Sequence, residues 1–120
     1  MKFDIITIFP RIFDSYFSES ILARAQEKKL IEIKVHNLRD YTEDKHKTVD
    51  DSPYGGGAGM VLMAEPILKA VEKIIGNPST SLRASKTKIV VFSAKGKQFN
   101  QKMAYDWSRK LGQIIFVCGR

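Results

Sequence analysis

The sequence predicts an α/β fold in which a mostly parallel sheet carries helices on both faces. Short apolar runs that suit strands alternate with segments of helical apolar spacing, in the order strand, helix, strand, helix, strand, helix, strand. The chain has 120 residues, of which 43% are hydrophobic, and this is the size of one ordinary domain with a single core. The sequence contains no internal repeat, so one domain is expected.

The first three elements lie in residues 2–35. Residues 2–9 are rich in Ile and Phe and end at Pro10, which is typical of a strand buried on both faces. Residues 20–29 have apolar residues at helical spacing and end in two lysines, which favours a helix. Residues 31–35 alternate between apolar and polar, which predicts a half-buried strand. We expect His36 to follow it as a solvated strand-end residue.

The remaining helices and strands follow a long polar segment. Residues 37–59 have no apolar period, and a loop of this length inside a compact domain is more typical of function than of connection. Residues 65–75 predict a helix with a proline in its first turn, and Gly76 ends it. Residues 77–88 read as a polar loop. The final elements are a short buried strand, a helix with Trp107 facing inward, and another strand, over residues 89–92, 100–111 and 114–117.

Parallel sheets of this kind bind ligands beyond the carboxyl ends of their strands. In this sequence those ends fall near Pro10, Asn37, residues 93–96 and residues 119–120. We therefore expect the functional loops at this edge of the sheet.

Composition narrows the class of protein. The formal net charge is +7, with 20 Lys and Arg against 13 Asp and Glu, which favours a polyanionic partner such as nucleic acid over a merely soluble basic surface. The single cysteine, Cys118, excludes a disulfide framework and a multi-cysteine zinc site, and it reads as a core thiol. No metal-ligand spacing involves His36 or His46. No apolar run is long enough to span a bilayer and no secretory signal is recognisable, so a cytoplasmic protein without membrane contact is expected.

The most informative segment is residues 50–60, which contain four glycines within five positions after Pro53 and Tyr54. Glycines at this density weaken an element unless the backbone needs positive φ or a close approach to a ligand. The spacing matches neither the dinucleotide-binding G-x-G-x-x-G pattern nor the phosphate-binding G-x-x-x-x-G-K-[ST] pattern. A ligand-binding loop of another kind is therefore predicted.

Four segments together resemble the bacterial tRNA (guanine-N1)-methyltransferases. They are residues 49–60, 65–67, 93–96 and 118–120, and residues 3–10 also look like the first strand of that family. The resemblance covers the whole chain, in order. It implies the knotted (SPOUT) class of methyltransferase, which transfers a methyl group from S-adenosylmethionine to N1 of the guanosine 3′ of the anticodon. It also implies a tRNA partner and a homodimer.

The resemblance also implies site residues, position by position. The cofactor-binding positions are Ser93, Ala94, Lys95, Gly96, Gly119 and Arg120. The positions that approach the target guanosine are Asp50, Pro53, Tyr54, Gly55, Gly56, Gly57 and Gly59. Family members typically have Ser-Pro-Gln-Gly in the first cofactor loop, so Ala94 and Lys95 depart from the pattern by removing a stiff proline and adding a cation.

The family pattern continues beyond the length of this sequence. Residues 1–120 are accordingly expected to form a partial N-terminal methyltransferase domain, truncated before the trefoil knot is complete. The general base and a supporting arginine are expected beyond Arg120, so no catalytic residue is assigned here and the chain alone is expected to be inactive. Without further segments, the last strand is expected to become an unprotected sheet edge.

Two other functions remain open from the residues themselves. The first is a non-catalytic RNA-binding module, favoured by the basic charge but disfavoured because the aromatic residues fall mostly at expected core positions. The second is an acid–base hydrolase using Asp50 and Asp51 or Glu43 and Asp44. Adjacent residues of an extended chain point apart, which disfavours a facing carboxylate pair.

Overall fold

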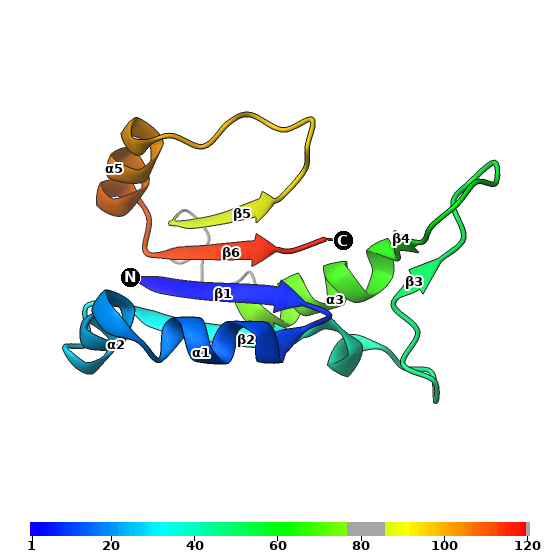
Figure 1. The fold of residues 1–120 in the computed structure, drawn as a ribbon, viewed down its shortest axis with the longest axis horizontal. Coiled ribbons are helices and arrows are strands. Elements are labelled where there is room, and N and C mark those ends of the chain that lie inside the picture. The colour runs from blue at the N-terminus through cyan, green and yellow to red at the C-terminus, as the bar shows by residue number, and fades with distance from the viewer. Residues whose placement is uncertain (77–85, 120) are drawn as a thin grey trace.

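The computed structural model describes residues 1–76 and 86–119. Four parallel strands form the main sheet in the spatial order β2-β1-β6-β5 (Figure 1). Their bounds are Lys2–Thr7 for β1, Glu32–Asn37 for β2, Thr87–Val91 for β5 and Gln113–Val117 for β6. The parallel sheet predicted from the alternation of elements is therefore confirmed. Of the predicted loop at residues 77–88, residues 77–85 lie outside the described residues, and Thr87 and Lys88 belong instead to β5.

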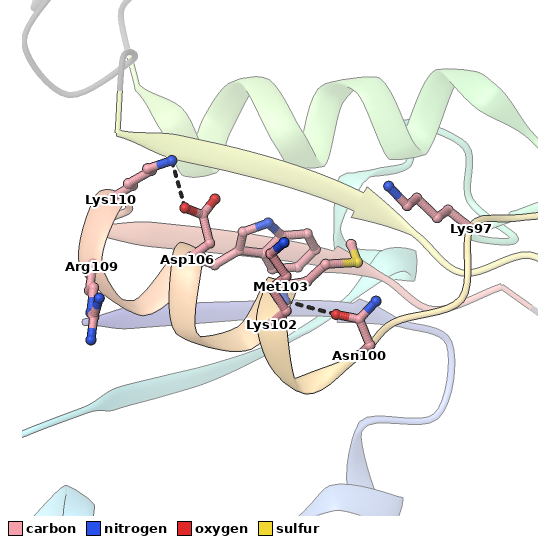
Figure 2. Close-up of a pocket in the computed structure, with 8 residues that line it drawn as sticks. Lys97, Asn100, Lys102, Met103, Asp106, Arg109 and Lys110 are labelled. Carbon is pink, nitrogen blue, oxygen red and sulfur yellow. Dashed lines mark hydrogen bonds and ion pairs between the residues drawn. The ribbon is translucent and has the colours of Figure 1, made fainter.

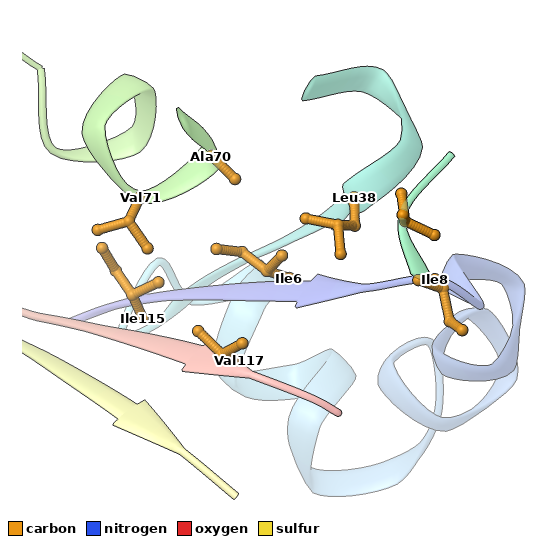
Figure 3. Close-up of a cluster of buried hydrophobic side chains, with 8 residues drawn as sticks. Ile6, Ile8, Leu38, Ala70, Val71, Ile115 and Val117 are labelled. Carbon is orange, nitrogen blue, oxygen red and sulfur yellow. The ribbon is translucent and has the colours of Figure 1, made fainter. Parts of the chain in front are cut away.

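The helices are α1 (Asp14–Phe17), α2 (Ser20–Glu27), α3 (Ala64–Ile75) and α5 (Gln101–Lys110), with two short 3₁₀ helices, η1 (Pro10–Phe13) and η2 (Leu38–Tyr41). Helix α3 and η2 cover one face of the sheet, and α1 and α2 lie beneath the other (Figures 1 and 3). Helix α5 packs on the second face through Trp107, whose ring lies below the ammonium of Lys88 on β5. Helices on both faces are therefore confirmed.

The core lies between the central strands and α3 (Figure 3). Ile6 of β1 and Ile115 of β6 are almost completely buried, and Ala70 and Val71 of α3 pack against them. Apolar residues recur on one side of α3 because its sequence has helical spacing, and burial of that stripe stabilises the helix more than its propensity does. The predicted core stripe of residues 65–75 is confirmed.

The position of the strands corrects two expectations. The last strand, β6, is not an edge, because it lies between β1 and β5. The strand predicted as buried at residues 89–92 is instead the edge strand β5, and Ile89, Val91 and Phe92 are exposed. An apolar run identifies a strand, but its burial depends on the place that the crossover connections give it in the sheet.

The long polar segment contains more regular structure than its sequence indicates. Besides η2, it includes strand β3 (Asp50–Asp51), which pairs antiparallel with β4 (Val61–Leu62). Val49, directly before β3, is fully buried in the core. Strands of two residues are too short to produce a period in the sequence, so this small ribbon was not predicted.

A buried polar network crosses the sheet from the first strand. The Asp4 carboxylate is fully buried and accepts hydrogen bonds from Nε2 of His36 at 2.7 Å and from Nε2 of Gln113 at 2.8 Å. Lys2 Nζ lies 3.3 Å from the same carboxylate, and the Tyr41 hydroxyl lies 3.0 Å from Nδ1 of His36. The expectation of a solvated His36 is therefore wrong, because its side chain is hydrogen-bonded to the buried Asp4 carboxylate. The sequence did not indicate this partner, because Asp4 lies within the apolar run of β1.

The pKa of Asp4 reflects this network. Burial alone would raise the pKa, but the hydrogen bonds from Gln113 and His36 and the charge of Lys2 outweigh it and lower the pKa below its ordinary value of 3.8. The carboxylate is therefore ionised at neutral pH and links three strands of the sheet.

Candidate cofactor and RNA site

The two expected cofactor loops begin at neighbouring positions on the carboxyl edge of the sheet. Backbone hydrogen bonds hold the segments that lead into them: the Phe92 N–H donates to the Val117 carbonyl at 3.2 Å, and the Cys118 N–H donates to the Ile6 carbonyl at 2.9 Å. Residues 93–96 and 118–119 therefore leave adjacent strands side by side. This is the edge at which parallel sheets bind ligands.

Residues 93–96 form a tight turn. The Gly96 N–H donates to the Ser93 carbonyl at 3.1 Å, and the Lys95 N–H donates to the Ser93 hydroxyl at 3.2 Å. A Cβ atom at Gly96 would lie 3.2 Å from the Ser93 carbonyl oxygen, closer than such contacts normally are. The turn therefore depends on glycine at position 96 for steric reasons.

The other expected cofactor residues have open surroundings. Ala94, Lys95 and Gly119 are exposed, and a Cβ atom at Gly119 would meet nothing within 4 Å. Arg120 lies outside the described residues. Cys118, directly before Gly119, is half-buried, and burial raises the pKa of its thiol. A protonated thiol in this position is consistent with a packing role and not with a nucleophile.

The glycine segment forms the tip of the β3-β4 ribbon, which projects from the body of the molecule (Figure 1). Gly55, Gly56, Gly57 and Gly59 all have positive φ, at 83°, 79°, 124° and 97°. The Gly56 N–H donates to the Pro53 carbonyl at 3.1 Å, which closes a turn. Of the two reasons that the sequence offered for these glycines, positive φ applies at all four positions, where other residues are disfavoured.

Tyr54 stands at this tip and is fully exposed. No Cβ atom placed on the four glycines would meet another atom within 4 Å, so the tip has open space on all sides of its backbone. Exposed N–H and C=O groups in such a segment can approach a flat, polar ligand closely. Within the described residues, no hydrogen bond or ring contact involves the Tyr54 side chain, so the fold itself does not explain why this aromatic residue is exposed.

The base of the ribbon anchors the tip to the core. Asp50 lies opposite Leu62 in the ribbon, and the Met63 N–H donates to the Val49 carbonyl at 2.8 Å. Asp51 is exposed and accepts a hydrogen bond from the Ser52 N–H at 2.7 Å. Because Asp50 and Asp51 are consecutive residues of a strand, their side chains leave opposite faces, which argues against a hydrolytic carboxylate pair.

A cavity of about 370 Å³ beside the ribbon base was not recognised in the sequence. Lys69 of α3 lies on its wall and bridges Glu43 at 2.9 Å and Glu65 at 2.7 Å. Hydrogen bonds from Glu65 and Glu43 raise the pKa of Lys69, which therefore stays charged. The sequence did contain a signal for this ion pair, because Glu65 and Lys69 are four residues apart and therefore lie on the same face of α3.

The carboxylate pair Glu43 and Asp44, considered above for a hydrolase, has a structural role. Asp44 accepts hydrogen bonds from the Thr48 N–H and hydroxyl and so stabilises a turn.

The structure brings together only part of the expected site. The two cofactor loops are adjacent, whereas no hydrogen bond or ion pair joins residues 53–59 to either of them within residues 1–76 and 86–119. The aromatic residues also differ from expectation, because many are exposed and not in the core. The exposed ones are Phe9, Tyr16, Tyr54, Phe92, Phe99 and Tyr105.

Two further classes of site were searched for in the described part of the chain. It contains no group of three or more His, Cys, Asp or Glu side chains that could hold a metal ion. None of its helices has the length and apolar character needed to cross a membrane.

Comparison with known proteins identifies the family. The family model described as tRNA (Guanine-1)-methyltransferase TrmD matches residues 1–120. Curated relatives named tRNA (guanine-N(1)-)-methyltransferase include one from Dictyoglomus turgidum, 51% identical over all of this chain and 45% of the relative. Another, from Thermomicrobium roseum, is 49% identical over all of this chain and 42% of the relative. A third, from Geobacter sp. (strain M21), is 47% identical over all of this chain and 45% of the relative.

These matches extend along the whole chain but along less than half of each relative. They agree with the order of motifs along the sequence, from the first strand through the glycine tip to the turn at residues 93–96. The chain therefore belongs to the tRNA (guanine-1)-methyltransferase family.

Proposed function

We propose that this chain forms part of an enzyme that transfers a methyl group from S-adenosylmethionine to N1 of the guanosine 3′ of the anticodon in tRNA. The observation that carries the proposal is the pairing of two features in a member of this family: a tight glycine-dependent turn at the carboxyl edge of the sheet, and an exposed glycine tip with four positive φ angles. The parent enzyme works as a cytoplasmic homodimer of the knotted class.

The carboxyl edge suits an adenosyl group. Residues 93–96 and 118–119 leave adjacent strands, and position 96 leaves little room for a side chain. Ser93, Ala94, Lys95, Gly96, Gly119 and Arg120 would hold the cofactor, which supplies an electrophilic methyl group when bound. The role of these residues is to position it and to exclude water from one side.

The glycine tip suits the target base. Tyr54 offers an exposed aromatic face, and base–aromatic stacking contributes about 1–3 kcal/mol per base in complexes with single-stranded RNA. The backbone of Gly55, Gly56, Gly57 and Gly59 can approach a base edge without side-chain obstruction. Asp50 and Pro53 shape the ends of the tip. In this proposal the tip moves toward the carboxyl edge when RNA binds.

No residue of this chain is assigned as the general base that takes the proton from guanine N1. The relatives are more than twice as long as the matched region, and we place the base in the remainder of their length. Residues 1–120 thus form a partial N-terminal domain with little or no methyl transfer when tested alone. Loss of a general base costs about 10²- to 10⁴-fold in rate.

A second candidate is a non-catalytic RNA-binding module. The basic net charge and the six exposed aromatic side chains favour it. The two candidates differ in one respect, since only the methyltransferase requires an adenosyl ligand at the carboxyl edge.

Calorimetric titration with S-adenosylmethionine and its demethylated product tests the choice. We expect binding by the chain extended to the length of its relatives, and weaker or absent binding by residues 1–120. Gly96→Ala in the extended form should weaken binding about tenfold, which corresponds to about 1.4 kcal/mol of strain in the turn. The matched control is Gly112→Ala at the opposite edge, where the new Cβ atom meets Lys86 at an ordinary 3.8 Å.

The titration also identifies failure of the proposal. Absence of binding by both lengths of chain would reject the methyltransferase assignment and favour the RNA-binding module. Equal effects of the Gly96 and Gly112 substitutions would show that the turn at residues 93–96 is not the cofactor site.

A further inference from the structure

The cations of this protein are unevenly distributed. Residues 86–119 contain seven Lys and Arg but a single carboxylate, Asp106, although the whole sequence has 13 Asp and Glu. The two expected cofactor loops do not account for this excess of positive charge, because only Lys95 of the seven cations lies in one of them. The remaining cations need another explanation.

Four of them line one groove. A cavity of about 660 Å³ runs along α5, with Lys97 before the helix and Lys102, Arg109 and Lys110 on it (Figure 2). Asp106 is the only carboxylate on its wall. We name this cavity the α5 groove.

Most of the positive charge in the α5 groove is not neutralised by the protein. Lys110 forms an ion pair with Asp106 at 2.6 Å, which uses the single carboxylate. Within the described ranges, no ion pair or side-chain hydrogen bond involves Lys97, Lys102 or Arg109. Three like charges on one wall repel each other, and a bound anion relieves that repulsion.

The helix that carries these cations is capped at its start and touches the edge of the sheet. Asn100 caps it by accepting a hydrogen bond from the Met103 N–H at 2.9 Å (Figure 2). Trp107 packs against Phe99 with ring centroids 5.2 Å apart, and the Lys88 ammonium lies 5.1 Å from the Trp107 centroid. The Lys88–Trp107 contact joins α5 to the edge strand β5, and the other side chains of the helix remain on the surface.

The spacing of the cations indicates the size of the ligand. Lys102 and Arg109 are seven residues apart on α5, which is about 10 Å along the helix axis. This spacing matches two successive phosphates of a polynucleotide, which two extended side chains can contact separately. The groove is also remote from the glycine tip, because α5 lies toward the amino ends of the strands and the tip lies beyond their carboxyl ends (Figure 1).

We infer that the α5 groove binds the phosphate backbone of the RNA substrate at a distance from the methylated base. This inference rests on the proposed function for the identity of the RNA. The groove contributes affinity without reading sequence, as phosphate contacts do. An RNA that reaches both surfaces must be long, because the molecule extends 45 Å in its longest dimension.

The test measures binding of a full-length tRNA transcript to the 120-residue chain by fluorescence anisotropy over a series of salt concentrations. The groove variant is Lys102→Gln with Arg109→Gln. We expect the slope of log K against log salt to fall in magnitude by about 1.4 to 1.8, the change for two lost phosphate contacts. The matched control is Lys28→Gln with Lys29→Gln, which removes the same charge from two exposed lysines at the end of α2 and should leave the slope nearly unchanged.

Circular dichroism of each variant establishes that the fold is retained. An unchanged slope in the groove variant, or an equal change in the control, would overturn the inference. Tighter binding of poly-glutamate than of tRNA, with the same dependence on Lys102 and Arg109, would also overturn it in favour of an acidic protein partner.

Failure of this inference is separable from failure of the proposed function. Titration of the extended chain with S-adenosylmethionine reports on the carboxyl edge and does not involve α5. Cofactor binding with an unchanged RNA salt slope rejects the groove alone. A changed slope without cofactor binding supports the groove and rejects the methyltransferase.

Discussion

The centre of the sheet and the tip of the β3-β4 ribbon use polar and flexible residues in opposite ways. At the centre, the buried Asp4 carboxylate has partners on two neighbouring strands and charge support from Lys2. At the tip, Tyr54 is fully exposed and the glycine backbone has empty space around it. One region satisfies its polar groups internally, and the other leaves them available.

This difference separates residues that specify the fold from residues that the fold itself does not require. A buried carboxylate is tolerated only when hydrogen bonds and charge compensate its desolvation, so its partners are as necessary as the carboxylate itself. An exposed tip with four positive φ angles contributes little to stability and is better explained by contact with another molecule. Substitutions in the two regions should therefore affect different measurements.

The largest effect is expected for Asp4→Ala. Loss of the carboxylate leaves the buried donors of His36 and Gln113 without their acceptor, and breaking a buried pair in this way costs about 3–5 kcal/mol. Urea denaturation followed by Trp107 fluorescence measures the change. Glu27→Ala, at an exposed position on α2, is the control and should change the free energy of unfolding by less than about 0.5 kcal/mol. A loss below about 1 kcal/mol at Asp4 would mean that the network does not stabilise the fold.

A smaller effect is expected on acidification of the wild-type chain. The pKa of Asp4 is lowered in the folded state, so its contribution to stability is complete above the unfolded value of 3.8 and is lost as pH falls through the lower folded value. Below about pH 4, the free energy of unfolding should therefore drop more steeply in the wild type than in Asp4→Asn. Parallel profiles for the two proteins would contradict the assigned role of the carboxylate.

The smallest effect on stability is expected for Tyr54→Ala. Its side chain is fully exposed, so the free energy of unfolding should change by less than about 0.5 kcal/mol. Binding of a single-stranded RNA containing guanosine should weaken by about 1–3 kcal/mol if the ring stacks on a base. Tyr54→Phe retains the ring and should bind like the wild type. Equal loss of binding in both variants would implicate the hydroxyl group and not stacking.

The sequence predicted most of the main sheet because its signals were local. The apolar run of β1, the alternation of β2 and the helical stripe of α3 each identify an element within a few residues. The glycine tip was equally visible, since four closely spaced glycines have few structural explanations. The resemblance to the methyltransferase family used these same segments.

The errors arose where the outcome depends on contacts between distant segments. The burial of His36 depends on Asp4, which lies 32 residues earlier, and the central place of β6 depends on its pairing with β1. The turn at residues 93–96 and the residues after β6 were located correctly at the sheet edge, but the separation of the glycine tip from them was not foreseeable. No local pattern reports how far a ribbon projects from the sheet.

The central place of β6 has a consequence for how the protein folds. β1 hydrogen-bonds to a strand that begins more than 100 residues later, and Gln113 completes the shell around Asp4 across a separation of 109 residues. The sheet therefore cannot close until residues 113–117 have left the ribosome. Before that point β1 and β5 each present an unpaired edge, and such long-range pairing makes folding slow and exposes the intermediate to aggregation.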